Sequence, residues 1–329
     1  MKKWSLAGGL LFLGVAVIAL ISVMWLTGIS IEWPNGASRT LANSSPSEAA
    51  YVDMAISPDW QTLALGTLQD GAQVWSVKDN KMLYSTEPGR VQTVAISPDG
   101  QMLALFWKSK DESSHRIELR QLSDGKLLRT LGDQEEWVYS LTFSADGQSL
   151  AVAASGEVQL FGVSDGKELR TIHATAWEVA LSPDGKLVAA GGEPVGVWRV
   201  ADGAPLHTVK GWHYMLFSPD GKVLATVDSV LDSNVNLWDT STGTLIGTLE
   251  APAPGMEQIH SLAFSPDSET LAAGTNGYSV HVWQVSTGKI QRTIRLGTNN
   301  PGEDVVFSPD GRTLAVQTNY KVQFWDLEK

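Results

Sequence analysis

A short phrase, Ser-Pro-Asp-Gly between two apolar runs, returns along the chain at nearly regular intervals. It reads AISPDGQMLA from Ala95, ALSPDGKLVA from Ala180 and VFSPDGRTLA from Val306. Self-similarity at this period is typical of a propeller or a solenoid, and it constrains the fold more than any local propensity does. The serines of the copies are spaced by 40, 47, 38, 36, 47 and 43 residues, and they are Ser57, Ser97, Ser144, Ser182, Ser218, Ser265 and Ser308.

The repeated phrase predicts a β-hairpin. Proline presets φ at one turn position, aspartate supplies a short hydrogen-bonding side chain, and glycine tolerates positive φ. The flanking apolar runs alternate, so each repeat begins with two strands, a and b, joined by this turn. A second hairpin of strands c and d follows, as in LFGVSDGKELRTI and LWDTSTGTLIGTL, where an aromatic residue precedes the turn glycine by five positions. Four strands per repeat make one propeller blade.

Seven repeats of this kind resemble the WD-repeat family of β-propellers, from about Gly36 to the end of the chain. The Trp-Asp pair itself is present at Trp238-Asp239 and at Trp325-Asp326. The Gly-His pair that usually precedes strand a is missing from every repeat, which implies that packing replaces most of the family's Asp–His–Ser–Trp network. TolB-like propellers, which share Ser-Pro-Asp-Gly, are the weaker resemblance. The prediction is an all-β, seven-bladed propeller of four-stranded antiparallel blades, of a membrane-anchored bacterial type.

The last repeat ends with strand c near Trp325 and has no strand d after it. The segment NGASRTL at Asn35–Leu41 is similar to the turn and strand d of other repeats, such as TGKIQRTI. We therefore expect residues 37–42 to supply the missing strand, because this closes the ring and leaves no open sheet edge. Residues 51–329 then form the propeller, and residues 32–50 form a linker that contains the closing strand. The alternative is a chance likeness within a linker.

Residues 1–31 differ in character from the rest of the chain. After Lys2 and Lys3, the segment Leu6–Leu26 contains 21 residues without a charge. As a helix it would reach roughly 30 Å, the thickness of a bilayer core. We expect an uncleaved signal anchor, since a signal peptide usually has a shorter apolar run and a small-residue cleavage site; a cleaved signal is the alternative. The two lysines orient the span with its N-terminus in the cytoplasm and the propeller on the outer side of the cell membrane.

Composition argues against several classes of function. A formal net charge of −12 and the lack of a basic stripe argue against nucleic-acid binding. The chain has no cysteine, which excludes disulfides, thiolate catalysis and cysteine-ligated metals. The repeated serine is a turn residue, and no Gly-x-Ser-x-Gly elbow, phosphate loop or dinucleotide fingerprint is present. We therefore expect neither an enzyme nor a cofactor.

The irregular loops are expected to share one face of the propeller. The resemblance implies that the b–c and d–a loops emerge on the same side, and the long ones are Trp107–His115, Asp228–Asn234, Glu250–Gln258 and Leu296–Glu303. Strand a lines the central channel in this fold, and the residue five positions before each repeat serine falls at its mouth on that face. These residues are Val52, Gln92, Tyr139, Trp177, His213, His260 and Glu303.

Aromatic and acidic residues dominate this mouth and its rim. Binding residues tend to lie on variable loops of a rigid scaffold, and tryptophan and tyrosine are enriched at interface hot spots. The alternative for the tryptophans is that they plug the channel or pack between blades. The candidate partner-binding residues are Arg90, Gln92, Trp107, Glu136, Trp137, Tyr139, Trp177, Glu193, Trp212, His213, His260, Glu303 and Tyr320.

Three of these residues, His213, His260 and Glu303, have the side-chain types of a zinc or non-haem iron site. Nothing in their spacing requires them to converge, so we expect solvated polar residues and no metal. The function predicted is a membrane-tethered, non-catalytic scaffold that binds a protein partner through the irregular loop face. The alternative is an extracytoplasmic receptor or sensor for a small ligand or a cell-envelope glycan.

Overall fold

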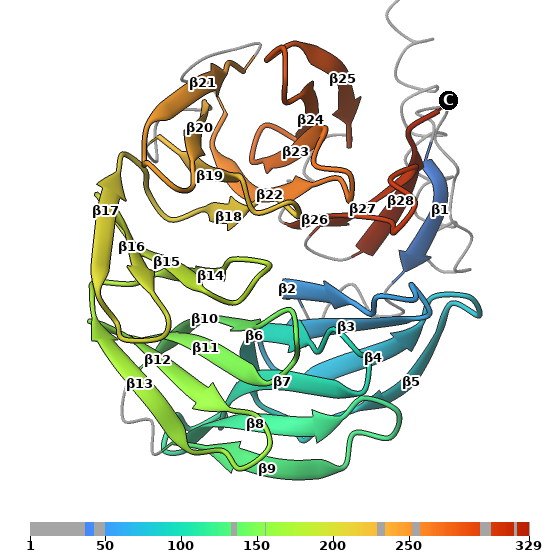
Figure 1. The fold of residues 1–329 in the computed structure, drawn as a ribbon. Helices are drawn as coiled ribbons and strands as arrows, with labels where there is room; N and C mark the ends of the chain where they lie inside the picture. Colours follow the sequence, from blue (N-terminus) through green and yellow to red (C-terminus); the bar gives the residue numbers. More distant parts are fainter. Residues whose placement is uncertain are drawn as a thin grey trace, which may run out of the picture.

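Seven four-stranded antiparallel sheets surround a central channel (Figure 1). The computed structural model describes residues 37–42, 50–132, 137–154, 156–228, 234–251, 257–296, 304–318 and 321–328. The predicted all-β, seven-bladed propeller is confirmed. None of the described segments forms a helix long and apolar enough to span a membrane. The expected span at Leu6–Leu26 lies outside the described residues.

Six blades are built from consecutive strands, with strand a innermost and strand d outermost. Blades 1 and 2 contain β2 (Tyr51–Ile56), β3 (Thr62–Thr67), β4 (Ala72–Ser76), β5 (Lys81–Ser85), β6 (Arg90–Ile96), β7 (Met102–Lys108), β8 (His115–Gln121) and β9 (Leu127–Leu131). Blades 3 and 4 contain β10 (Val138–Phe143), β11 (Ser149–Ala154), β12 (Glu157–Gly162), β13 (Glu168–His173), β14 (Glu178–Leu181), β15 (Leu187–Gly191), β16 (Val195–Arg199) and β17 (Pro205–Val209). Blades 5 and 6 contain β18 (Met215–Phe217), β19 (Val223–Val227), β20 (Val235–Asp239), β21 (Leu245–Leu249), β22 (Ile259–Phe264), β23 (Thr270–Thr275), β24 (Ser279–Gln284) and β25 (Ile290–Arg295).

The seventh blade combines the two ends of the described chain. Its strands a to c are β26 (Asp304–Phe307), β27 (Thr313–Thr318) and β28 (Lys321–Asp326), and its strand d is β1 (Ala37–Ala42). β1 pairs antiparallel with β28, with Leu41 opposite Val322 and Ala37 opposite Trp325. Figure 1 shows the blue β1 beside the red β28. β1 is thus the outermost strand of the seventh blade.

The repeated Ser-Pro-Asp-Gly phrase forms a self-contained turn between strands a and b. In blade 2, the Gly100 N–H donates to the Ser97 carbonyl at 2.8 Å, which closes the turn. The Ser97 hydroxyl donates to Asp99 Oδ1 at 2.6 Å and accepts from the Met102 N–H at 2.9 Å. The serine hydroxyl also holds the pKa of the turn aspartate below its usual range in every blade. All seven serines are buried, so they are structural turn residues and not nucleophiles.

The core of the molecule lies between blades. Apolar side chains form seven clusters, and each joins two neighbouring blades. Between blades 4 and 5, for example, Val195 and Val209 pack with Met215 and Phe217. A sheet with one neighbour on each face must be apolar on both, which explains the near-continuous apolar runs in strands b and c. The stability of each blade therefore depends on its two neighbours.

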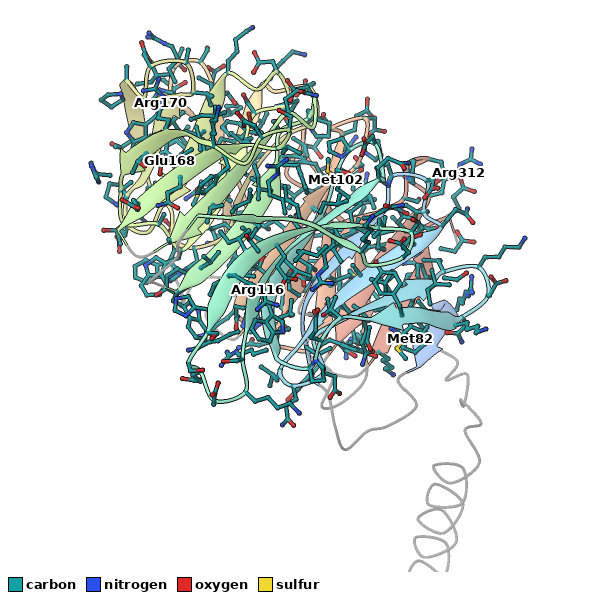
Figure 2. All side chains as sticks on the ribbon, turned by 90° about the horizontal axis from the view of Figure 1, so that it is seen from below. Met82, Met102, Arg116, Glu168, Arg170 and Arg312 are labelled. Atoms are coloured by element: carbon teal, nitrogen blue, oxygen red, sulfur yellow. The ribbon has the colours of Figure 1, made fainter. Side chains whose placement is uncertain are left out.

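A polar contact repeats at the outer edge of these seams. The residue of strand d that follows the bulge in its pairing with strand c lies at this edge. In most blades its side chain reaches the c–d turn of the next blade. Arg129 donates to the carbonyls of Ser164 at 2.7 Å and Asp165 at 2.8 Å. Arg170, labelled in Figure 2, donates to the Ala201 carbonyl at 2.7 Å. The other residues at this register are Arg39, Tyr84, His207, Gly247 and Arg292.

We predict that Leu41→Ala destabilises the whole ring. Leu41 is 4% exposed and packs between blades 7 and 1 with Tyr51 and Phe324. Truncating a buried leucine typically costs about 2–5 kcal/mol. Urea unfolding of the full chain in a mild detergent measures the loss. The matched control is Leu83→Ala on strand d of blade 1, where the side chain is 50% exposed and the expected change is below about 0.5 kcal/mol. Equal, small effects would contradict closure by packing.

We predict that Gly247→Arg stabilises the seam between blades 5 and 6. Gly247 holds the register at which other blades carry an arginine, and a Cβ added there meets nothing within 4 Å. A guanidinium at this position reaches the turn that precedes Gly288, as Arg129 reaches the turn that precedes Gly166 at the seam between blades 2 and 3. Such hydrogen bonds contribute about 0.5–1.5 kcal/mol. Gly247→Ala is the control, because it removes only the backbone penalty of glycine in a strand. The prediction is wrong if both variants unfold at the same urea concentration.

Candidate functional site

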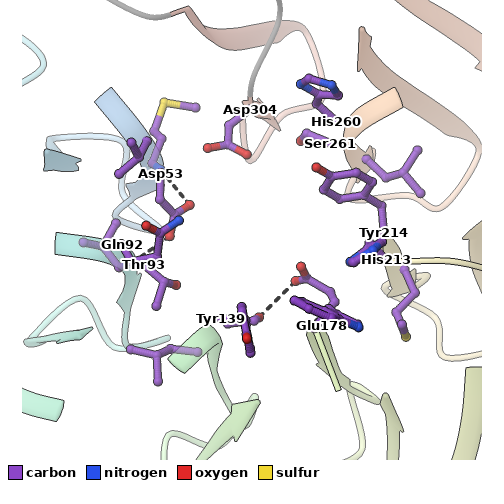
Figure 3. Close-up of a pocket in the computed structure, with 18 of the residues that line it drawn as sticks. Asp53, Gln92, Thr93, Tyr139, Glu178, His213, Tyr214, His260, Ser261 and Asp304 are labelled. Carbon is purple, nitrogen blue, oxygen red and sulfur yellow. Dashed lines mark hydrogen bonds between the residues drawn. The ribbon is translucent and has the colours of Figure 1, made fainter. Parts of the chain in front are cut away.

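The innermost strands of the blades enclose a cavity of about 410 Å³ at one mouth of the channel (Figure 3). Ligand sites in proteins commonly occupy about 300–1,000 Å³. Six of the seven residues predicted at the channel mouth line this cavity, and they are Val52, Gln92, Tyr139, Trp177, His213 and His260. The seventh, Glu303, lies outside the described residues. The structure thus brings the described members of the predicted set together in one hollow.

Aromatic rings form a continuous arc around part of the mouth. Tyr139 of blade 3 lies 4.6 Å from Trp177 of blade 4, measured between ring centroids, and Trp177 lies 5.2 Å from His213. The arc continues through Tyr214, whose ring stacks on His260 at 6.3 Å. Trp177 is 41% exposed, which is unusual for the largest apolar side chain. The arc therefore offers an aromatic wall to whatever enters the channel.

A second set of residues lies one position further along strand a, and the sequence analysis missed it. The residue four positions before each repeat serine also lines the cavity, and all seven are polar: Asp53, Thr93, Ser140, Glu178, Tyr214, Ser261 and Asp304. The signal was available as a polar residue at one register in every repeat, followed by an apolar residue. A β-bulge explains why two consecutive side chains reach the channel, since strand a skips a pairing at Val52, Gln92, Tyr139 and His260.

Part of this polar ring has a structural role. The inner edge of strand a has backbone N–H groups without a strand partner, and neighbouring side chains satisfy some of them. Asp53 Oδ2 accepts from the Val94 N–H of blade 2 at 2.7 Å. The Ser261 hydroxyl accepts from the Val305 N–H of blade 7 at 3.0 Å. These bonds join consecutive blades around the channel.

Three of the ring residues, Asp53, Glu178 and Asp304, carry carboxyl groups, and burial shifts the pKa of ionisable groups at this mouth. Burial raises the pKa of Glu178 to about 8, against the effect of the hydroxyl of Ser140, which donates to Oε1 at 3.0 Å. Burial likewise raises the pKa of Asp53 to about 6, although hydrogen bonds from Val94, Thr93 and Met54 and one shared with Asp304 limit the increase. Burial lowers the pKa of His213 below its usual range, so this imidazole is neutral at pH 7. The channel mouth therefore gains negative charge as pH rises through these values.

The other predicted site residues lie in three kinds of surroundings. Trp107 is 8% exposed, packs between blades 1 and 2 and donates from Nε1 to the Glu87 carbonyl at 3.2 Å. Trp107 thus packs between blades, as the alternative for the tryptophans supposed, whereas Trp212 is only partly buried and its ring lies edge-on to that of His213 at 4.9 Å between centroids. Half-buried Trp137 lies between the cations of Arg90 and Lys108, whose distances to its ring centroid are 4.9 Å and 4.5 Å.

The remaining three site residues give no further geometry for the mouth. Glu193 is exposed in the b–c loop of blade 4, before Pro194. Glu136 and Tyr320 lie outside the described residues, as Glu303 does. Within the described chain, no group of three or more histidine, aspartate or glutamate side chains is arranged to hold a metal ion.

A Ser-His-carboxylate cluster in blade 6 deserves comparison with a catalytic triad. Glu257 Oε2 lies 2.8 Å from His281 Nε2 and accepts from the Ser279 hydroxyl at 2.9 Å. In a triad, the serine and the carboxylate bind opposite nitrogens of the histidine. Here both lie at Nε2, while Nδ1 faces Thr293 at 3.1 Å. Ser279 is also buried, so the cluster tethers the loop before β22 to blade 6 and offers no nucleophile to a substrate.

Comparison with known proteins agrees with this geometry. The family model "WD domain, G-beta repeat" matches residues 125–161 and 243–284. Each matched range begins with strand d of one blade and covers strands a to c of the next, which is the order that β1 and β28 require at the two ends of the described chain.

Several curated relatives share part of the chain. Periodic tryptophan protein 2 of Arabidopsis thaliana is 32% identical over 45% of this chain and 17% of its own length. WD repeat-containing protein slp1 of Schizosaccharomyces pombe is 23% identical over 83% of this chain and 58% of its own. Apoptotic protease-activating factor 1 of Rattus norvegicus is 24% identical over 84% of this chain and 23% of its own. The chain thus spans less than two thirds of each of these relatives.

A solved structure gives the same fold. A chain in the crystal structure of the mitotic checkpoint complex matches with a TM-score of 0.75 at 20% identity, and the match covers 91% of this chain and 98% of that chain. At this identity the likeness concerns the fold alone. WD40 repeats typically build scaffolds that bind proteins and do not catalyse reactions. The chain is a seven-bladed β-propeller, and two of its segments match the WD40 repeat model.

Proposed function

We propose that this protein is a membrane-tethered, non-catalytic scaffold that binds a protein partner through the irregular loop face of the propeller. The observation that carries the proposal is the difference between the two faces. On one face, the Ser-Pro-Asp turns satisfy their own polar groups and repeat with little variation. On the other face lie the long loop between β7 and β8, the cavity and the exposed ring of Trp177. The second face therefore offers a specific partner more distinctive contacts than the first.

The membrane part of the proposal rests on the sequence. We propose that Leu6–Leu26 anchors the chain in the cell membrane, with its N-terminus in the cytoplasm and the propeller outside. One feature of the fold is compatible with such an anchor. β1 begins at Ala37 opposite Trp325, on the side of the c–d turns, so the chain enters the propeller from the turn face. The loop face and its cavity then lie on the side opposite to the point of attachment.

The second candidate function, an extracytoplasmic receptor or sensor for a small ligand or a cell-envelope glycan, is favoured by the cavity. Its volume of about 410 Å³ suits a small molecule, and aromatic rings line part of its wall. A thermal-shift screen with sugars and small metabolites distinguishes this function from a scaffold, because it needs no protein partner to raise the melting temperature.

We predict that Trp177→Ala reduces retention of the partner by at least about tenfold, since truncating an anchoring tryptophan often costs about 2 kcal/mol or more. Partners are captured by cross-linking in native membranes and quantified by mass spectrometry. The control is Leu169→Ala on outer strand β13, which removes an apolar side chain that is 57% exposed. Both variants must first melt as the unchanged protein does. Loss of the partner with Leu169→Ala and not with Trp177→Ala would move the binding surface to the rim of the blades.

We predict that protease added to intact cells or spheroplasts digests the propeller, because the charge bias at Lys2 and Lys3 keeps the N-terminus inside. The readout is loss of the 35.5 kDa chain on an immunoblot raised against the propeller. A cytoplasmic protein in the same sample controls for lysis. Digestion only after detergent lysis would contradict the orientation, and release of the intact chain by alkaline carbonate would contradict the anchor.

A further inference from the structure

The channel mouth combines two kinds of lining in one cavity. The aromatic arc of Tyr139, Trp177, His213, Tyr214 and His260 spans blades 3 to 6. Carboxyl groups face the same hollow from both sides, with Asp53 and Asp304 from blades 1 and 7 and Glu178 from blade 4 (Figure 3). Aromatic faces and carboxylates share one preference, because both attract a cation.

The described lining of the cavity contains three carboxyl groups and two histidines. Among the described residues that line the cavity, none is a lysine or an arginine. The nearby side chains of Arg90 and Lys108 lie against the ring of Trp137 and do not line the cavity. A narrow cleft that is lined by negatively charged carboxylates concentrates cations. Above about pH 8, where Asp53 and Glu178 have lost their protons, the mouth is negative. It is also partly apolar and large enough for more than a bare ion.

We propose that the channel mouth binds a guanidinium or ammonium group in the space between the aromatic arc that contains Trp177 and the carboxylates of Asp53 and Asp304. The flat faces of tryptophan and tyrosine are the best partners for such a group within about 6 Å of the ring centroid. A planar guanidinium also fits two neighbouring carboxylates through its fork of N–H donors. A bare divalent metal is a poorer fit, since the described residues include no metal-binding group of three.

This inference deepens the proposed function and rests on it in one respect: the cationic group would be an arginine or lysine of the protein partner that enters the channel. The same chemistry is offered by a free amine such as a polyamine. The two sources share the recognised group and differ in what surrounds it. A peptide backbone would also contact the loops around the mouth, whereas a free amine would not.

Binding of a cation at this place should depend on pH. The titratable groups that face the mouth are Asp53, Tyr139, Glu178, His213, Tyr214, His260 and Asp304. Burial raises the pKa of Asp53 to about 6 and that of Glu178 to about 8, so both gain negative charge between pH 5 and pH 9. Burial lowers the pKa of His213, so this imidazole is neutral at pH 7 and adds no positive charge above it. All of these changes favour a bound cation, so affinity should increase from pH 5 to pH 9.

The test is calorimetric titration of the full chain, in mild detergent and low salt at pH 8, with three probes. The peptide Ala-Arg-Ala supplies a guanidinium on a peptide backbone. Agmatine supplies a guanidinium on a small free amine without a peptide backbone. Ala-citrulline-Ala is the neutral isostere of the arginine peptide. We expect the citrulline peptide to bind at least about tenfold more weakly than the arginine peptide, a difference of about 1.4 kcal/mol. If the arginine peptide binds more tightly than agmatine, the source is a protein side chain; the reverse order indicates a free amine.

Charge-matched variants locate the site. Asp304→Asn and Trp177→Leu should each weaken the arginine peptide at least about tenfold. Asp202→Asn removes the same charge from an exposed c–d turn on the opposite face, and it should change the affinity less than about twofold. Glu178→Gln is the second channel variant, used if Trp177→Leu does not fold. It should lower affinity at pH 9 and flatten the rise from pH 5.

Three results would overturn the inference. One is equal affinity for the arginine and citrulline peptides. Another is an equal loss of affinity for the arginine peptide in Asp304→Asn and Asp202→Asn, which would indicate that binding depends on the overall negative charge of the protein and not on the channel mouth. The third is no heat from any cation up to about 10 mM, since a single-group ligand is expected near the millimolar range. The inference can fail alone, if partner retention depends on Trp177 while no probe binds. Conversely, probe binding without any retained partner would contradict the scaffold and leave the cation site in place.

Discussion

Ring closure is the constraint on which the rest of this structure depends. Every blade buries both of its faces against neighbours, so a blade without a neighbour would expose a sheet of valine, leucine and alanine. Blades that follow one another along the chain leave a junction between the last blade and the first, and the pairing of β1 with β28 closes this junction. Leu41 then packs against blade 1 from a strand that lies far from it in sequence. Four strands from two ends of the described chain thus hold seven blades in register with one another.

The same closure explains why the repeats can vary so much in their loops. Each Ser-Pro-Asp turn is stabilised by bonds within itself, and each interblade cluster is formed mostly by strand residues. Few of these residues belong to the b–c or d–a loops, so those loops carry insertions at little cost to the fold. A rigid disc with one conservative face and one variable face is the physical basis for the proposed binding role. Polar contacts such as those of Arg129 and Arg170 strengthen the outer seams and leave the variable face untouched.

The channel shows how one set of side chains serves both structure and recognition. Strand a has an inner edge that no further strand covers, and its N–H groups need acceptors. Asp53 and Ser261 provide them for the next blade, which accounts for polar residues in the middle of the molecule. Once carboxyl groups line a narrow space, their charge is costly unless they are protonated or paired. The raised pKa values of Asp53 and Glu178 express this cost, and a cation from outside would relieve it.

The sequence by itself determined the number of blades, the four strands of each blade and the place of the closing strand. These features follow from local chemistry that repeats: a turn that only Ser-Pro-Asp-Gly-like segments form well, and apolar alternation on both sides of it. It also placed Tyr139, Trp177, His213 and His260 at one mouth, because a fixed offset from a repeated turn is a fixed position in a symmetric ring.

Only the tertiary structure decided which aromatic rings are exposed and which second residue of strand a reaches the channel. Trp107 and Trp177 were both expected on the irregular face, yet Trp107 is 8% exposed and Trp177 is 41% exposed, because packing between blades depends on the neighbouring blade. In a regular strand, successive side chains point to opposite faces, so Asp53 would point away from the channel if Val52 points into it. The bulge at Val52 breaks that period and brings both side chains to the mouth, and bulges arise from pairing between strands that no single segment specifies.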